Sequence, residues 1–116
     1  MIKVFKGIIP QMACTTIIRE GLTRPQISAG IGKNNTTSEG RSTKVTFIDN
    51  EFIKSYIYEL ATHNFKNYII EEAEDLQFAT YTEGDFYGLH SDADKDNNRL
   101  LSVSVQLSKS SDYKGG

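Results

Sequence analysis

The chain has 116 residues, of which 38% are hydrophobic and 24% are charged, and its formal net charge at pH 7 is −2. This length accommodates one domain or part of one, and this charge does not suggest a basic surface for nucleic acid or anionic lipid. No apolar run approaches the roughly 18 residues of a transmembrane helix, and no secretory signal is recognisable, so we expect neither a membrane span nor secretion.

The single cysteine, Cys14, cannot form a disulfide within the chain. A chain without disulfides suits a reducing compartment, so we expect a cytoplasmic protein. Cys14 lies in the mostly apolar residues 12–18, and free cysteines are among the most buried side chains. The sequence therefore predicts a packed thiol and not a reactive one. It also argues against a zinc site built from several cysteines.

In the first part of the chain, the pattern predicts a strand, a helix and a loop. Residues 2–9 are mostly apolar and predict an extended first strand. Pro10 is suited to the start of a helix over residues 11–20, which Gly21 would end. Residues 23–43 are rich in Thr, Ser, Asn and Gly, which predicts a long surface loop. Two interpretations of this loop stay open: disorder, or a mobile loop beside a substrate.

A strand and a second helix are predicted next. Residues 43–48 alternate between polar and apolar side chains, as a strand with one buried face does. Asp49 or Asn50 can cap the helix that follows, and Glu51 in its first turn suits the helix dipole. Apolar residues then recur at helical spacing and would form the inner face of this helix: Phe52, Ile53, Tyr56, Ile57 and Leu60.

Strands dominate the remainder of the predicted structure. The candidates are residues 68–70, 76–81 and 100–107, and the last alternates regularly between apolar and polar side chains. We therefore predict an α+β domain. Residues 1–66 would form a helical support region, and residues 67–116 would form the first core strands.

The motif that carries chemistry is His90-Ser91-Asp92. In an extended chain, residues i and i+2 point to the same side, so the imidazole and the carboxylate project together. A 2-His-1-carboxylate facial triad needs two ligands in that arrangement, and it holds Fe(II) with positions left open for a cosubstrate and oxygen. The motif is short and common, however, and a lone His–Asp pair is more often a surface hydrogen bond.

Spaced residues on both sides of this pair strengthen the metal interpretation. They are Leu76, Gln77, Phe78, Tyr81, Gly84 and Tyr87 before the pair, and residues 99–107 and 112–116 after it. In this order they resemble the front half of the prolyl 4-hydroxylase-type Fe(II)- and 2-oxoglutarate-dependent dioxygenases, especially the small bacterial and phage PKHD-type hydroxylases. The resemblance implies one domain, with N-terminal helices packed on an incomplete double-stranded β-helix (jelly-roll, cupin-like) core.

The resemblance also implies roles for individual residues. His90 and Asp92 would be the first two ligands of Fe(II). Tyr81, ahead of the metal pair, would hydrogen-bond the cosubstrate 2-oxoglutarate. Gln106, on the strand after the pair, would be a second contact of the cosubstrate.

Two further residues would lie on the substrate side. Tyr87 would line the substrate, although packing explains an aromatic residue beside a turn equally well. Arg99 would meet the substrate or pair with the carboxylates of residues 92–96. The implied reaction is hydroxylation of a C–H bond, in a peptidyl proline of a peptide or protein substrate, with release of succinate and CO₂ and with ascorbate as a helper. A bacterial cell or a phage-infected host cell would be the setting.

The resemblance stops before the family pattern is complete. The third iron ligand of the family is a histidine downstream of Gly115-Gly116, followed by an Arg or Lys that holds the far carboxylate of 2-oxoglutarate. Neither is among these residues, which would make the domain C-terminally truncated. The other histidine, His63, would cap or decorate the end of the predicted helix. We expect this chain alone to bind iron weakly and not to turn over, and a longer parent to be active.

Two alternatives stay open beside the oxygenase. The acidic residues 92–98 resemble a calcium loop, but Asn97 stands where glycine is needed and Val103 where a bidentate Glu is needed. The chain could instead be a non-catalytic fragment or interaction module, because a half-built sheet would expose strand edges that can pair with a partner.

Overall fold

The computed structural model describes residues 1–29, 40–93 and 95–115, which form a small α+β fold with two helices and two antiparallel sheets. The predicted α+β class is confirmed at this level. In chain order the elements are α1 (Gln11–Leu22), β1 (Ile27–Ser28), β2 (Arg41–Ser42), β3 (Lys44–Ile48), α2 (Glu51–Asn64), β4 (Leu76–Thr80), β5 (Phe86–Tyr87) and the 3-10 turn η1 (Ser110–Asp112). Neither described helix is long and apolar enough to cross a membrane.

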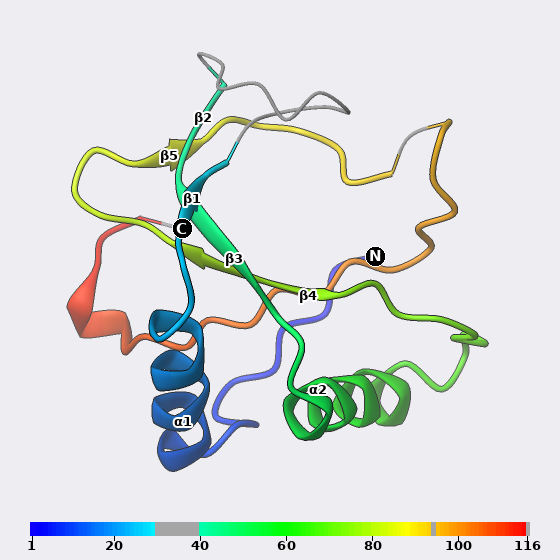
Figure 1. The fold of residues 1–116 in the computed structure, drawn as a ribbon. Coiled ribbons are helices and arrows are strands. Elements are labelled where there is room, and N and C mark those ends of the chain that lie inside the picture. The colour runs from blue at the N-terminus through cyan, green and yellow to red at the C-terminus, as the bar shows by residue number, and fades with distance from the viewer. Residues whose placement is uncertain (30–39, 94, 116) are drawn as a thin grey trace.

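The larger sheet has the strand order β1-β3-β4, and the smaller sheet pairs β2 with β5. Both helices lie on the same side of the larger sheet, and the β2–β5 pair lies at the end of β3 away from α2 (Figure 1). The core forms where one residue from each of α1, β3 and α2 meets the others: Ile17, Ile48 and Ile53. Burial of such aliphatic side chains supplies the main favourable free energy of folding.

The start of α2 follows the prediction from its capping residue. Asn50 Oδ1 accepts hydrogen bonds from the backbone N–H groups of Phe52 and Ile53, at 3.0 and 3.2 Å. The predicted inner face is correct at Ile53, which is buried, and wrong at Phe52, whose side chain is 90% exposed. Consecutive residues are about 100° apart around a helix, so only one of these two neighbours can face the sheet.

The prediction that Gly21 ends α1 is wrong, because Gly21 lies inside the helix, which continues to Leu22. A Cβ atom at this position would come within 2.6 Å of ring carbons of Phe78, which belongs to β4. The missing side chain therefore lets the helix backbone approach the sheet. Cys14 on the same helix is buried and unpaired, which confirms the predicted packed thiol.

Three predicted strands are wrong in the described chain. Residues 2–9, 68–70 and 100–107 form no ladder. Leu107 still packs against the core, so the alternation in the last segment marks partial burial without strand pairing. The predicted loop over residues 23–43 is also wrong in part, because it contains β1 and β2, while its residues 30–39 lie outside the described structure. An alternating sequence pattern indicates which side chains are buried. Pairing of strands also requires that a sheet edge with free backbone N–H and C=O groups lies beside the segment.

The two sheets share one interrupted ladder. Lys44 pairs with Thr80 at the end of β3–β4, and Ser42 pairs with Phe86 at the start of β2–β5. One residue on the first strand therefore opposes five on the second, residues 81–85, which bulge outward as a turn. Asp85 closes this turn, since its carboxylate accepts from the N–H and hydroxyl of Thr82 at 2.8 and 2.9 Å and from the Ser42 hydroxyl at 3.0 Å.

Gly21→Ala is expected to destabilise the fold, although alanine favours a helix by about 1 kcal/mol. Overpacking against the Phe78 ring costs about 1–3 kcal/mol, so a net loss of about 1 kcal/mol is expected. Urea unfolding of both proteins measures this change. Thr16→Ala, at an exposed site of the same helix, is the control and should change stability little. A more stable Gly21→Ala protein would contradict the proposed close approach.

Asp85→Asn is expected to lower stability at neutral pH and to leave it nearly unchanged in acid. Three hydrogen bonds hold the pKa of Asp85 below its usual value. In decreasing order of effect they come from the Thr82 backbone, the Thr82 hydroxyl and the Ser42 hydroxyl. A lowered pKa contributes stability above the unfolded value of about 3.9, and this stability is lost as the pH falls through the folded value. The unfolding midpoints of the two proteins should converge as the pH falls through the lowered pKa of Asp85. Parallel curves would show that the Asp85 charge is not involved.

Candidate metal centre

The candidate site follows directly on β5. The N–H of Gly88 donates to the carbonyl of Gly40 at 2.7 Å, which closes the end of the β2–β5 ladder. The chain then turns so that both nitrogens of His90 are engaged: Nδ1 lies 2.8 Å from the Gly88 carbonyl oxygen, and Nε2 lies 3.1 Å from Oδ1 of Asp92. The structure therefore brings together the two predicted metal ligands, with their donor atoms facing each other.

The protonation of this pair follows from what each partner can do. A carbonyl oxygen only accepts hydrogen bonds, so Nδ1 of His90 must carry the proton that it donates to Gly88. In a neutral imidazole, Nε2 then carries a lone pair, and this lone pair faces a carboxylate oxygen of Asp92. Two acceptors at 3.1 Å repel each other, so this arrangement needs a proton or a metal cation between them.

The spacing of the facing atoms fits a cation. Two ligand atoms that each lie ~2.1 Å from one metal at a right angle are ~3.0 Å apart. Metal-binding histidines also commonly donate their second ring N–H to a backbone carbonyl, as His90 does. His90 and Asp92 therefore have the geometry of neighbouring ligands of one ion.

Asp92 is held as a carboxylate. The Ser102 hydroxyl donates to Oδ2 at 2.5 Å, and this hydrogen bond is the main cause that lowers the pKa of Asp92, against a smaller opposing effect of desolvation. The charge and hydrogen bond of His90 and the charge of Arg99 lower the pKa further. One oxygen of Asp92 is thus committed to Ser102, and the other remains directed at His90.

Arg99 has a structural contact in this arrangement. Its Nε and Nη2 donate to both carboxylate oxygens of Glu74, at 2.7 and 2.6 Å, and its Nη1 donates to the backbone carbonyl of Asp92 at 2.9 Å. This two-pronged contact lowers the pKa of Glu74. Arg99 thus links residues 92–99 to the segment before β4 through an ion pair with Glu74.

Tyr87 lies at the site, whereas Tyr81 and Gln106 do not join it. The rings of Tyr87 and His90 stack with centroids 3.6 Å apart and an angle of 14° between their planes. Tyr81 follows β4 at the start of the bulge and is half exposed, and Gln106 is exposed on the segment that forms no strand. Within the described parts of the chain, no hydrogen bond or ring contact joins either one to His90 or Asp92. Their predicted contacts with 2-oxoglutarate stay predictions.

Three contacts of the site were not anticipated from the sequence: those of Ser102, Gly88 and Arg41. Ser102 lies ten residues after Asp92, and the polar side of the alternating segment 100–107 was its only signal. Gly88 acts through its backbone, which a side-chain pattern does not report. The Arg41 guanidinium lies over the Tyr87 ring, 4.2 Å from its centroid, and this contact arises only when β2 pairs with β5.

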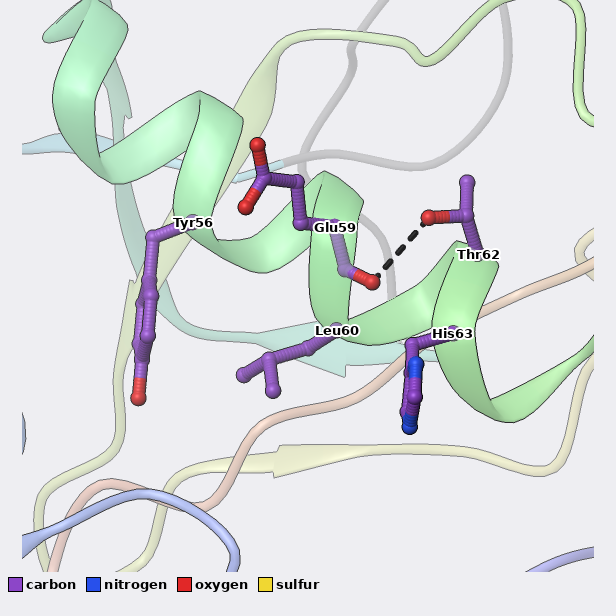
Figure 2. A pocket seen from close by; sticks show the side chains of 5 residues that line it. All are labelled: Tyr56, Glu59, Leu60, Thr62 and His63. Carbon is purple, nitrogen blue, oxygen red and sulfur yellow. Dashed lines mark hydrogen bonds between the residues drawn. The ribbon is translucent and has the colours of Figure 1, made fainter.

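His63 lies on the last turn of α2 and belongs to a separate surface pocket of about 490 Å³. Residues of α2 alone line this pocket, and His63 projects from the same side of the helix as Tyr56 and Leu60 (Figure 2). Over residues 1–29, 40–93 and 95–115, no three His, Cys, Asp or Glu side chains are grouped so as to hold a metal. The described residues therefore bring together two candidate ligands, and no third lies beside them.

Other chemistries fit the site less well. A Ser–His–Asp nucleophile requires the hydroxyl to donate to the imidazole, whereas Ser102 donates to the carboxylate of Asp92. An EF-hand requires a helix on each side of residues 92–98, and the described flanks are β5 and residues 100–107, which form no helix. The described flanks therefore do not fit an EF-hand. Asp94 of that predicted loop lies outside the described residues.

Ser102→Ala is expected to raise the pKa of Asp92 toward its usual value, because the largest contribution to the shift is lost. Carboxyl carbon NMR shifts followed against pH measure the change at this residue directly. Ser104→Ala, two residues further along the same segment, serves as the matched control. An unchanged titration of Asp92 in the Ser102→Ala protein would show that the hydroxyl does not bind the carboxylate.

Comparison of the chain with protein-family models, with curated proteins and with solved structures gives no match. Interpretation of the site therefore depends on its own geometry and on the residue pattern around His90 and Asp92.

Proposed function

We propose that this chain is part of an Fe(II)- and 2-oxoglutarate-dependent dioxygenase of the prolyl 4-hydroxylase type, with His90 and Asp92 as two of the iron ligands. The observation that carries the proposal is the placement of His90 Nε2 at 3.1 Å from Asp92 Oδ1, while Nδ1 is held by the Gly88 carbonyl. A proton or a metal cation can lie between these atoms, and imidazole with carboxylate is the ligand set of the iron oxygenases.

The proposed fold is the first part of a double-stranded β-helix with helices packed on its outer face. Two features support it: both helices cover one side of the larger sheet (Figure 1), and the ladder continues past the bulge from β3–β4 into β2–β5. In a jelly roll, antiparallel strands likewise pass from one sheet into the next. The pair of ligands comes directly after this passage.

Each residue has a distinct part in the proposed site. His90 and Asp92 would hold the metal, the Gly88 carbonyl sets the tautomer of His90, and Ser102 orients Asp92 and lowers its pKa. Iron with 2-oxoglutarate supplies the oxidising chemistry when bound, in which a C–H bond is hydroxylated and succinate and CO₂ are released. The protein supplies position and electrostatics. We propose a peptidyl proline as substrate and ascorbate as a helper, with free amino acids and other protein side chains as alternatives.

His90→Ala and Asp92→Ala are each expected to weaken Fe(II) binding by at least about tenfold, because each removes one of two described ligands. Anaerobic Fe(II) titration followed by NMR measures this affinity even when it is weak. His63→Ala is the matched control, since it removes the other histidine, and it should leave binding unchanged. Equal affinity in the wild-type and His90→Ala proteins would rule out the proposed centre.

Addition of 2-oxoglutarate to the anaerobic Fe(II) protein tests the cosubstrate. A visible charge-transfer band is expected, and it should be absent in the His90→Ala and Asp92→Ala proteins. Succinate formation coupled to hydroxylation of a proline-containing peptide is expected where a third ligand completes the iron site. If the protein binds iron but shows no charge-transfer band on addition of 2-oxoglutarate, the oxygenase proposal is contradicted. His90 and Asp92 would then form a metal site that does not use this cosubstrate.

A further inference from the structure

His90 and Asp92 lie near the surface, yet their facing atoms take one defined arrangement. The side chain of His90 is 37% exposed and that of Asp92 is 44% exposed. An imidazole at such a site that is held by one hydrogen bond can rotate about the axis of that bond, since its terminal torsion is broad. The Nδ1 contact with Gly88 therefore does not by itself fix the direction of Nε2. Besides the Nε2 contact with Asp92, a second contact, on the face of the ring, sets its plane.

Tyr87 supplies that second contact. Its ring lies nearly parallel to the imidazole of His90, with 3.6 Å between the centroids and 14° between the planes. The hydrogen bond to Gly88 sets the orientation of the imidazole within its plane, and the stack sets the plane itself. Together these two contacts direct Nε2 at Asp92 Oδ1. Stacked rings gain about 0.5–1.5 kcal/mol beyond the burial of their area.

Arg41 in turn fixes Tyr87. The two residues are partners across the β2–β5 ladder, and the Arg41 Cζ lies 4.2 Å from the centre of the Tyr87 ring. Arg41 is itself held, because it is only 8% exposed and its Nε and Nη2 donate to Thr43 Oγ1 at 3.0 Å and to Gln77 Oε1 at 3.2 Å. These partners are neutral, so the positive charge remains available to the π face of the ring.

We infer that Arg41 and Tyr87 are positioning residues for His90: Arg41 holds the Tyr87 ring, and that ring holds the imidazole with Nε2 directed at Asp92. The nature of the ligand, a divalent metal cation, rests on the proposed function. Partners that orient a metal ligand contribute about 10–100-fold to metal affinity without touching the metal. Loss of the Tyr87 ring is therefore expected to weaken cation binding while both ligands stay in place.

The position of the imidazole can be measured without any metal. Ring protons that lie over an aromatic face are shifted upfield in the NMR spectrum, and His63 provides an unstacked reference within the same chain. Upfield His90 signals are expected in the wild-type protein and in Tyr87→Phe, which keeps the ring. In Tyr87→Leu the signals should move toward those of His63. Arg41→Gln, which removes the charge, should cause a smaller movement in the same direction.

Titration with Zn(II), followed at the His90 signals, measures the consequence for binding. Tyr87→Leu is expected to weaken the Zn(II) affinity by about 10–100-fold and Arg41→Gln by less. Tyr87→Phe keeps the ring and should therefore bind Zn(II) as the wild-type protein does. Arg24→Gln is the matched control, since it removes another arginine with bonds to two carboxylates at the α1–β1 connection, and it should alter stability and not Zn(II) affinity.

The outcomes separate this inference from the proposed function. Wild-type His90 signals without an upfield shift overturn the inference, and this result does not depend on any variant folding. A folded Tyr87→Leu protein with unchanged Zn(II) affinity also overturns it. Upfield His90 signals in a wild-type protein that binds neither Zn(II) nor Fe(II) contradict the proposed metal site, while the contact from Arg41 through Tyr87 to His90 stands.

Discussion

The hydrogen bond from His90 Nδ1 to the carbonyl of Gly88 is the constraint on which the site depends. Because a carbonyl cannot donate, this bond selects the tautomer of the imidazole and leaves Nε2 as the atom that faces Asp92. The Ser102 hydroxyl binds the other oxygen of Asp92 and lowers the pKa of this carboxyl group. A ring nitrogen and a carboxylate oxygen held face to face require a proton or a metal cation between them. Removal of any one of these contacts would relax that requirement.

The backbone creates this arrangement by an irregularity in the sheet. Residues 81–85 bulge out of the ladder, so that β5 pairs with β2 beyond the end of β3–β4. This step brings Tyr87 opposite Arg41 and carries the following residues into the turn that holds His90. Arg41 also hydrogen-bonds Gln77 of β4. The exposed site is thereby tied to the buried part of the fold, which a loop alone would not achieve.

His90 and Asp92 would be two ligands of the proposed iron site. An imidazole and a carboxylate with facing donor atoms are suited to a first-row metal, and their partners orient them as partners of metal ligands do. Two ligands alone hold a metal weakly, and the second histidine, His63, lies in a separate pocket on α2. The same geometry disfavours hydrolysis by Ser102, since its proton is directed at Asp92 and not at the imidazole.

Local chemistry in the sequence was enough to predict α1, β3, α2 and β4 in outline, the cap at Asn50, the buried Cys14 and the facing pair His90 and Asp92. Each of these depends on residues within a few positions of one another. Tertiary structure alone decided that residues 2–9 and 100–107 form no ladder within the described parts of the chain and that Gly21 lies inside its helix against Phe78. It also brought Arg41 onto Tyr87 and Ser102 onto Asp92. These contacts join residues that lie 10 to 57 positions apart, and short-range periodicity cannot report them because they depend on which strand edges meet.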